Sequence, residues 1–174
     1  MANPWIQTVS GRRVDLVNPD PSTINLTDIA HSLSMKCRCN GHSHGFYSVA
    51  EHSIWVSRLL TSKLALAGLL HDANEAYLQD IPSPVKWLLP DYHIIEDRVQ
   101  EAIEKKFGLE LTSREHKSVK RADDIMLATE ARDFMCNTEG WGLKQSPMPE
   151  LLTLYPRLGM ESFLRTAELL GLVI

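Results

Sequence analysis

Polar side chains interrupt an apolar run abruptly at residues 69–76, which read Leu-Leu-His-Asp-Ala-Asn-Glu-Ala. On a helix, Asp72 follows Leu69 by three residues and so continues its buried row. Glu75 lies four residues after His71, so the same face carries these two side chains as well. An ionised carboxylate among apolar residues is costly unless it is paired or bound to a metal. The segment indicates either a metal site or a simpler arrangement, an Asp–His pair or a hydrogen bond to nearby backbone.

A second candidate ligand, His52, lies on another predicted helix. It shares an apolar stripe with Val49 and Val56, a spacing that turns its side chain toward the core. A lone histidine on an apolar face is usually a core residue with a hydrogen-bond partner. Together with His71 and Asp72, however, it is a candidate metal ligand.

Asp123 is the candidate from a third predicted helix. It falls on the stripe of Val119 and Met126, which points it inward. Its neighbour Asp124 falls nearer Lys120, and we expect Asp124 on the solvent side. Three separate helices thus each offer an inward side chain of a metal-ligating type.

The candidate ligands are His52, His71, Asp72 and Asp123. Two imidazoles and two carboxylates suit one divalent transition metal, which would be Mn, Co, Fe, Ni or Zn, and suit Ca poorly. Coordination positions left open would admit water and a substrate oxygen. The set therefore favours a metal-assisted reaction.

The elements that must position these residues are mostly helical. Periodicity, caps and turn residues predict first a β-like pair of runs at 5–9 and 14–17, then a short helix capped by Thr27 and a loop over 37–45. Three helices follow: one opened by the capping box of Ser48 and Glu51, one from Ser62 to about Leu78, and one over 91–107 ended by Gly108. The capping box of Thr112 and Glu115 then opens a helix to about Met135, which is followed by an irregular segment over 137–156 and a last helix over about 160–170. We therefore predict an all-α fold, a helical bundle with a short N-terminal β-like hairpin, in a single domain over 1–174.

The composition of the chain indicates its class of protein, its partners and its compartment. The chain has 174 residues, 44% of them hydrophobic and 23% charged, which is ordinary for a globular domain. A net charge of −4 gives no basic field, so we expect no nucleic-acid partner. The three cysteines are too few and odd in number for a disulfide framework, and the first residues do not read as a secretory signal. No apolar run is long enough for a bilayer, so we expect a cytoplasmic protein without a membrane partner.

Three segments carry a resemblance to a known family. They read Phe-Tyr-Ser-Val-Ala-Glu-His-Ser at 46–53, His-Asp-Ala-Asn-Glu-Ala-Tyr-Leu-Gln-Asp-Ile-Pro-Ser-Pro-Val-Lys at 71–86, and Val-Lys-Arg-Ala-Asp at 119–123. Over roughly residues 10–135 the chain resembles the HD-domain metal-dependent phosphohydrolase superfamily and is similar to its small bacterial and phage 5′-deoxynucleotidase-like members. The resemblance implies a helical bundle of the HD type. It also implies metal ligands at His52, His71, Asp72 and Asp123.

The resemblance further implies catalytic carboxylates at Glu75 and Asp80. Glu75 would orient or deprotonate the attacking water, and Asp80 would position that water or protonate the leaving group. Arg38 best matches the family's phosphate-binding arginine, although Cys39 stands where the nucleotidases have an aromatic residue, so nucleotide selectivity is not carried over. Lys86 would add a second positive charge for the phosphate or is a solvated surface lysine.

The implied activity is hydrolysis of the 5′-phosphate ester of a (deoxy)nucleoside monophosphate. The alternatives are hydrolysis of a deoxynucleoside triphosphate with loss of pyrophosphate or triphosphate, a more distant cyclic-nucleotide hydrolysis, and a non-catalytic metal- or nucleotide-binding HD protein. His42 and His44 leave room for a second metal such as Mg, and a homodimer or higher homo-oligomer is a family-level expectation. Glu130, seven residues beyond Asp123, either orients a ligand histidine or pairs with a surface arginine.

A competing interpretation places the metal in the loop over 37–45 instead of at His52, His71, Asp72 and Asp123. Four soft ligand types, at Cys37, Cys39, His42 and His44, fall within eight residues and would make a zinc-binding interaction module. Cys-x-Cys followed by His-x-His is not a usual structural zinc spacing, and the loop is short for a tetrahedral site. The HD interpretation is therefore preferred, and the two differ in which substitutions remove the metal.

Overall fold

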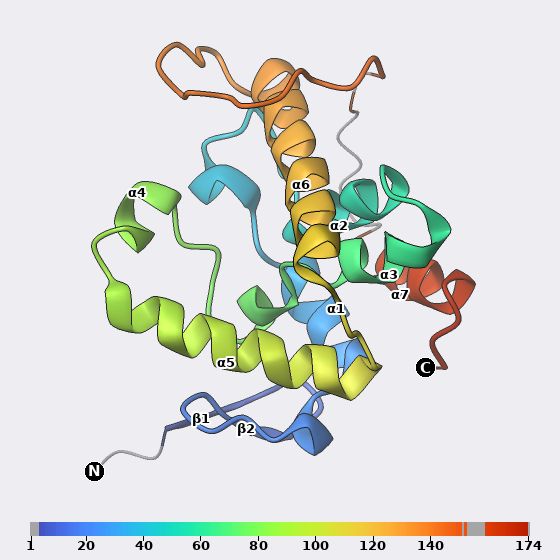
Figure 1. Ribbon diagram of the computed structural model, residues 1–174. Coiled ribbons are helices and arrows are strands. Elements are labelled where there is room, and N and C mark those ends of the chain that lie inside the picture. Colours follow the sequence, from blue (N-terminus) through green and yellow to red (C-terminus); the bar gives the residue numbers. More distant parts are fainter. Residues whose placement is uncertain (1–3, 151, 153–158, 174) are drawn as a thin grey trace.

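The computed structural model describes residues 4–150, 152 and 159–173. In these residues the chain is mostly helical, with a small antiparallel hairpin at the N-terminal end (Figure 1). The elements in order are β1 (Trp5–Gln7), β2 (Arg13–Asp15), η1 (Pro21–Thr23), α1 (Leu26–Ser34), η2 (Arg38–Gly41), α2 (Val49–Arg58), α3 (Ser62–Leu69), η3 (Ala73–Ala76), α4 (Ser83–Lys86), α5 (Pro90–Phe107), α6 (Ser113–Phe134) and α7 (Gly159–Leu169), where η marks a 3-10 helix. The predicted mostly helical architecture and its N-terminal hairpin are confirmed.

The hairpin is fixed to the first helix through its turn. Ile6 pairs with Val14 across the two strands, and Val14 is fully buried. In the turn, the backbone N–H of Ser10 donates to Asp28 Oδ1 at 3.0 Å, and the Ser10 hydroxyl donates to Asp28 Oδ2 at 2.7 Å. Asp28 belongs to α1 and is itself buried. This double contact holds the turn in place over the helix.

Helix starts agree with the predicted caps in two places and differ in two. The capping boxes of Ser48 at α2 and of Thr112 at α6 are both formed. Helix α1, by contrast, begins earlier than expected, because Asn25 rather than Thr27 caps it by accepting from the next backbone N–H groups. The N-cap of α3 is Thr61 rather than the expected Ser62.

The predicted helix from Ser62 to about Leu78 is wrong, because α3 ends at Leu69. The reason is local. The carbonyl of Gly68, which would accept the backbone N–H of Asp72 in a continuous helix, instead accepts the ring Nδ1–H of His71 at 2.9 Å. The next hydrogen bonds span three residues rather than four, and a tighter 3-10 turn follows. His71 and Asp72 therefore lie at a break between two helices.

Helix α2 lies at the centre of the packing and carries a candidate ligand. It contacts α1, α3, α6 and α7, and its buried side chains include Val49, Val56 and His52. Helix α5 ends at Gly108, whose φ of 66° is the left-handed conformation expected after a helix. The irregular segment predicted over 137–156 has no helix or strand in its described part, and α7 confirms the predicted last helix. None of the described helices is both long and apolar enough to cross a membrane.

Candidate metal centre

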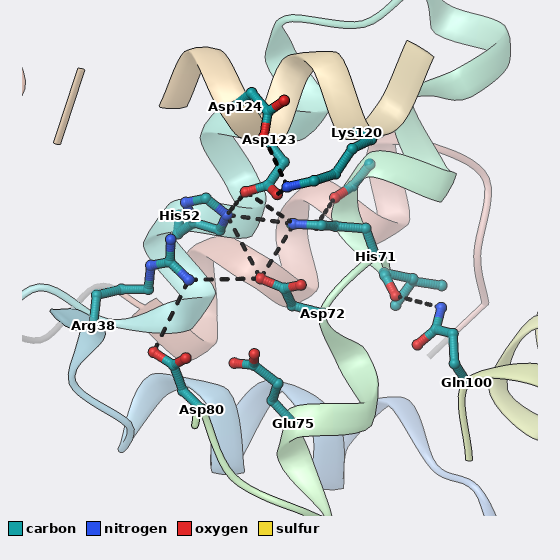
Figure 2. A network of polar contacts seen from close by, with 12 residues as sticks. Arg38, His52, His71, Asp72, Glu75, Asp80, Gln100, Lys120, Asp123 and Asp124 are labelled. Atoms are coloured by element: carbon teal, nitrogen blue, oxygen red, sulfur yellow. Dashed lines mark hydrogen bonds and ion pairs between the residues drawn. The ribbon is translucent and has the colours of Figure 1, made fainter. Parts of the chain in front are cut away.

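The candidate ligands converge from three parts of the fold (Figure 2). His52 comes from the middle of α2, and Asp123 comes from α6, which packs against α2. His71 and Asp72 come from the break after α3. On a continuous helix, neighbouring side chains point about 100° apart. The break lets two adjacent residues reach the same place.

The facing atoms of this cluster are close together. The Nε2 atoms of His52 and His71 lie 3.3 Å apart. Asp72 Oδ2 lies 3.6 Å from the first of these nitrogens and 3.2 Å from the second. These three residues each place one ligand atom within 4.8 Å of the others. Asp123 Oδ1 lies 3.1 Å from His52 Nε2 and 3.8 Å from His71 Nε2, so it borders the same point.

The donor set fits a divalent cation. Two nitrogens bound to one ion at about 2.0–2.1 Å in a tetrahedral arrangement lie about 3.3 Å apart, which is the separation of the two Nε2 atoms. The two carboxylates, Asp72 and Asp123, balance the two positive charges of such an ion. Imidazole with carboxylate is a ligand set for Mn, Fe, Co, Ni or Zn. His52, His71 and Asp72 could therefore hold a metal ion, and Asp123 borders the same point.

The Nδ1 atoms of both histidines face away from the cluster and are fixed by hydrogen bonds. His52 Nδ1 lies 2.5 Å from Glu130 Oε1, and both side chains are buried. His71 Nδ1 donates to the Gly68 carbonyl. A ring whose Nδ1 carries the proton presents an unprotonated Nε2 to a metal, and such partners are typical of ligand histidines. Glu130 therefore lies against His52 and not against a surface arginine.

The carboxylates favour positive charge at this centre. Burial alone would lower the pKa of His71, but the charge of Asp72 and a hydrogen bond with Asp123 raise this pKa to about 10. Burial and the charge of Arg38 likewise oppose protonation of His52, yet its pKa is raised, chiefly by Glu130. The imidazoles in turn hold the pKa of Asp123 well below its usual range in spite of its burial. A divalent cation would satisfy the same negative charge in place of these protons.

Arg38 approaches the cluster from the turn η2. Its Nη2 donates to Glu130 Oε2 at 3.2 Å, while Nη1 lies 3.7 Å from Asp72 Oδ2 and 4.0 Å from Asp80 Oδ2. Burial would lower the pKa of this guanidinium, but the charges of Glu130, Asp72 and other carboxylates outweigh burial and raise it. The arginine is thus held charged, with Nη1 turned toward the candidate ligands and free of a short hydrogen bond.

Glu75 and Lys86 face each other beside the cluster. Glu75 is buried on η3, and its Oε1 lies 3.8 Å from Lys86 Nζ. Lys86, on α4, also lies 2.5 Å from Glu96 Oε1 and is mostly covered, so it is not a solvated surface lysine. The other oxygen of Glu75, Oε2, is buried and accepts no hydrogen bond from the described residues. In Figure 2 the Glu75 carboxylate lies between those of Asp80 and Asp72.

Two lysines of the site were not predicted. Lys36 Nζ donates to the backbone carbonyl of Glu75, and burial lowers its pKa against the raising charges of Glu75 and Asp80. Lys120 is 62% exposed, as expected, and also contacts Asp123 Oδ2 at 2.6 Å and Asp124 Oδ1 at 2.8 Å. Asp124 thus lies beside Lys120, as the spacing predicts, with its side chain 15% exposed. Because neither lysine lies on an apolar stripe, hydrophobic periodicity does not predict that they contact the site.

The competing cysteine and histidine loop does not form a ligand group. Among residues 4–150, 152 and 159–173, three metal-ligating side chains gather only at His52, His71 and Asp72. In the loop, Cys37 and Cys39 are free thiols.

Substitution of Glu130 tests how the histidine is oriented. We expect Glu130→Gln to weaken metal affinity by about 10- to 100-fold, because the amide cannot replace the charged partner of His52 Nδ1. Metal affinity is measured by titrating the metal-free protein with Mn in competition with a chelator. Glu139→Gln, at an exposed position, is the matched control and should leave affinity unchanged. Equal affinity of Glu130→Gln and wild type would contradict the orienting role.

Two bacterial proteins are similar to this chain. The uncharacterized protein YfdR of Escherichia coli (strain K12) is 48% identical over 132 residues, which span 75% of this chain and 72% of YfdR. The uncharacterized protein RCAP_rcc00048 of Rhodobacter capsulatus is 38% identical over 146 residues, which span 77% of this chain and 74% of that protein. No protein-family model matches the chain. At this identity and coverage, the chain belongs to the same protein family as YfdR and RCAP_rcc00048.

Proposed function

We propose that this protein is a metal-dependent phosphohydrolase with an HD-type helical bundle, and that it hydrolyses the 5′-phosphate ester of a (deoxy)nucleoside monophosphate. One observation carries the proposal: two imidazoles and two carboxylates meet at one point, with a mostly buried arginine and three further carboxylates beside them. The bound divalent metal would lower the pKa of water and polarise a phosphoryl oxygen. The resemblance of the segments around His52, His71 and Asp123 to HD-domain phosphohydrolases gives the reaction class.

Arg38 is the group that would bind the phosphate. A guanidinium offers planar, charge-assisted hydrogen bonds to phosphoryl oxygens. Its Nη2 is engaged with Glu130, but the N–H groups of Nη1 lie 3.7 Å or more from Asp72 and Asp80, beyond a short hydrogen bond. A phosphoryl oxygen can therefore take these N–H groups. Phosphoryl transfer depends mainly on such positioning and on neutralising spread negative charge.

Glu75 is the group that would receive the proton of the attacking water. Burial, followed by the charges of Asp72 and Asp80, raises its pKa well above the usual range, so its carboxylate accepts a proton readily. Lys86 Nζ lies 3.8 Å from Glu75 Oε1, while Glu75 Oε2 accepts no hydrogen bond from the described residues and is the oxygen that would take the proton.

Asp80 is the group that would serve the leaving oxygen. In the reaction, a bond forms between the water oxygen and phosphorus, and the bond between phosphorus and the ester oxygen breaks. One proton leaves the water for Glu75, and the leaving oxygen gains one. We assign this proton to Asp80, whose Oδ2 lies 4.0 Å from Arg38 Nη1.

A screen of nucleotides tests this proposal. The protein, loaded with Mn, Co or Mg, is incubated with deoxy- and ribonucleoside mono- and triphosphates and a cyclic nucleotide, and products are identified by mass. We expect a nucleoside and inorganic phosphate from a monophosphate. A triphosphate yielding pyrophosphate or triphosphate would replace the monophosphate as substrate. Binding without any product would instead indicate a non-catalytic metal- or nucleotide-binding protein.

A further inference from the structure

A cavity of about 590 Å³ has Asp80, a residue of the proposed reaction site, in its wall. Its walls come from the β1 hairpin, the C-terminal part of α1, the turn η2 and the segment after η3. Its volume lies within the range of small-molecule sites, about 300–1,000 Å³. The cavity is therefore large enough for an organic group attached to the phosphate.

The cavity is joined to the proposed reaction site by two side chains. Asp80 lines the cavity and also lies 4.0 Å from Arg38. Lys36 lines it as well and donates to the backbone carbonyl of Glu75. A phosphate at Arg38 would thus have its ester oxygen near Asp80, and the rest of the ester would extend into the cavity.

Residues with strained backbone lie in or next to the wall of this cavity. Among the described residues, the non-glycine positions with positive φ are Cys39 (53°), Asn40 (52°) and Gln79 (128°). Such conformations are costly for cysteine and glutamine, though less so for asparagine, and they persist where the surrounding structure holds them, often at binding sites. Asn40 and Gln79 line the cavity, and Cys39 stands between Arg38 and Asn40. Strained backbone thus brings two side-chain amides to the wall.

Two apolar side chains stand among polar ones at the mouth of the cavity. Val9 and Met35 line it although they are 61% and 70% exposed, so they lie at its rim. Val9 belongs to the hairpin turn, which the Ser10–Asp28 contacts fasten to α1, and Met35 is the residue that ends α1. These two apolar side chains and the amides of Asn40 and Gln79 belong to one lining, so the cavity offers an apolar surface to the faces of a planar ring and hydrogen bonds to its edge.

We infer that this cavity binds the nucleoside part of the substrate, with Val9 and Met35 against the base and the amides of Asn40 and Gln79 setting base selectivity. The inference rests on the proposed function for the placement of the phosphate.

Binding of free nucleosides tests the inference separately from catalysis. Isothermal titration uses the Mn-loaded protein with two probes: a panel of four deoxynucleosides, and inorganic phosphate. We expect Val9→Trp, which narrows the mouth, to weaken nucleoside binding by at least about tenfold and to leave phosphate binding unchanged. Val17→Trp is the matched control, because Val17 is 38% exposed and is not among the cavity residues; it should bind both probes as wild type does.

Two further variants test selectivity without disturbing the backbone. Asn40→Gly and Gln79→Gly remove the amides at positions where glycine adopts the same φ without cost. We expect each to reduce the preference among the four nucleosides.

Failure of the inference and failure of the proposed function are distinguishable. Nucleosides that bind Val9→Trp as tightly as wild type, or that do not bind wild type at all, overturn the inference even if nucleotides are hydrolysed. Nucleosides that bind in the expected way, with no phosphate released from any nucleotide, support the cavity and contradict the enzyme.

Discussion

His71→Ala is expected to lower phosphate release at least about a hundredfold and to remove the bound metal. Partners of metal ligands already contribute about 10- to 100-fold to affinity or activity, and loss of a ligand removes more. Outside the cluster, the only described side-chain hydrogen bond of His71 is the one to the Gly68 carbonyl at the break after α3, so the unfolding curve must show that the variant is folded before the losses are assigned to the metal. The measurements are metal content after dialysis, phosphate release and the thermal unfolding curve.

His42→Ala is the matched control for this prediction. His42 is exposed and belongs to the loop of the competing zinc interpretation. We expect this variant to keep both its metal and its turnover. Loss of metal from His42→Ala, with metal retained in His71→Ala, would move the metal site to the cysteine and histidine loop.

Glu75→Gln is expected to lower kcat by about 10²-fold or more, since the amide cannot accept the proton of the attacking water. The substitution keeps the size of the side chain and leaves Lys86 paired with Glu96. KM should change little, because the group acts in the transition state and not in substrate binding. Steady-state kinetics on the nucleotide identified by the screen, with metal content measured in parallel, checks both values.

Glu110→Gln, at an exposed position, controls for loss of a negative charge in general and should leave kcat unchanged. Near-normal kcat in Glu75→Gln with metal still bound would show that Glu75 is only a partner of Lys86. The water would then have to lose its proton to another group.

Much of the fold was accessible from periodicity and caps. The boxes of Ser48 and Thr112 mark the starts of α2 and α6, and both helices bury the stripes that the spacing predicts. Because these stripes also carry His52 and Asp123, the inward direction of both ligands followed from the same pattern. The contact between α2 and α6 then brings the two side chains together.

The rest of the site depends on contacts that are distant in the sequence. At the helix break, the His71 side chain takes the Gly68 carbonyl that a backbone N–H would otherwise use. The spacing of apolar residues does not predict such a side-chain hydrogen bond. The pairing of Arg38 with Glu130 joins residues 92 positions apart. The contact of Lys36 with the Glu75 carbonyl likewise needs the tertiary fold. Spacing along one helix cannot report such partners.

Anomalous diffraction from crystals of the Mn-loaded protein tests the central claim most directly. We expect one strong peak bounded by His52 Nε2, His71 Nε2 and carboxylate oxygens of Asp72 and Asp123. A peak at another place, or none at this one while the crystallised protein still hydrolyses nucleotides, would contradict it.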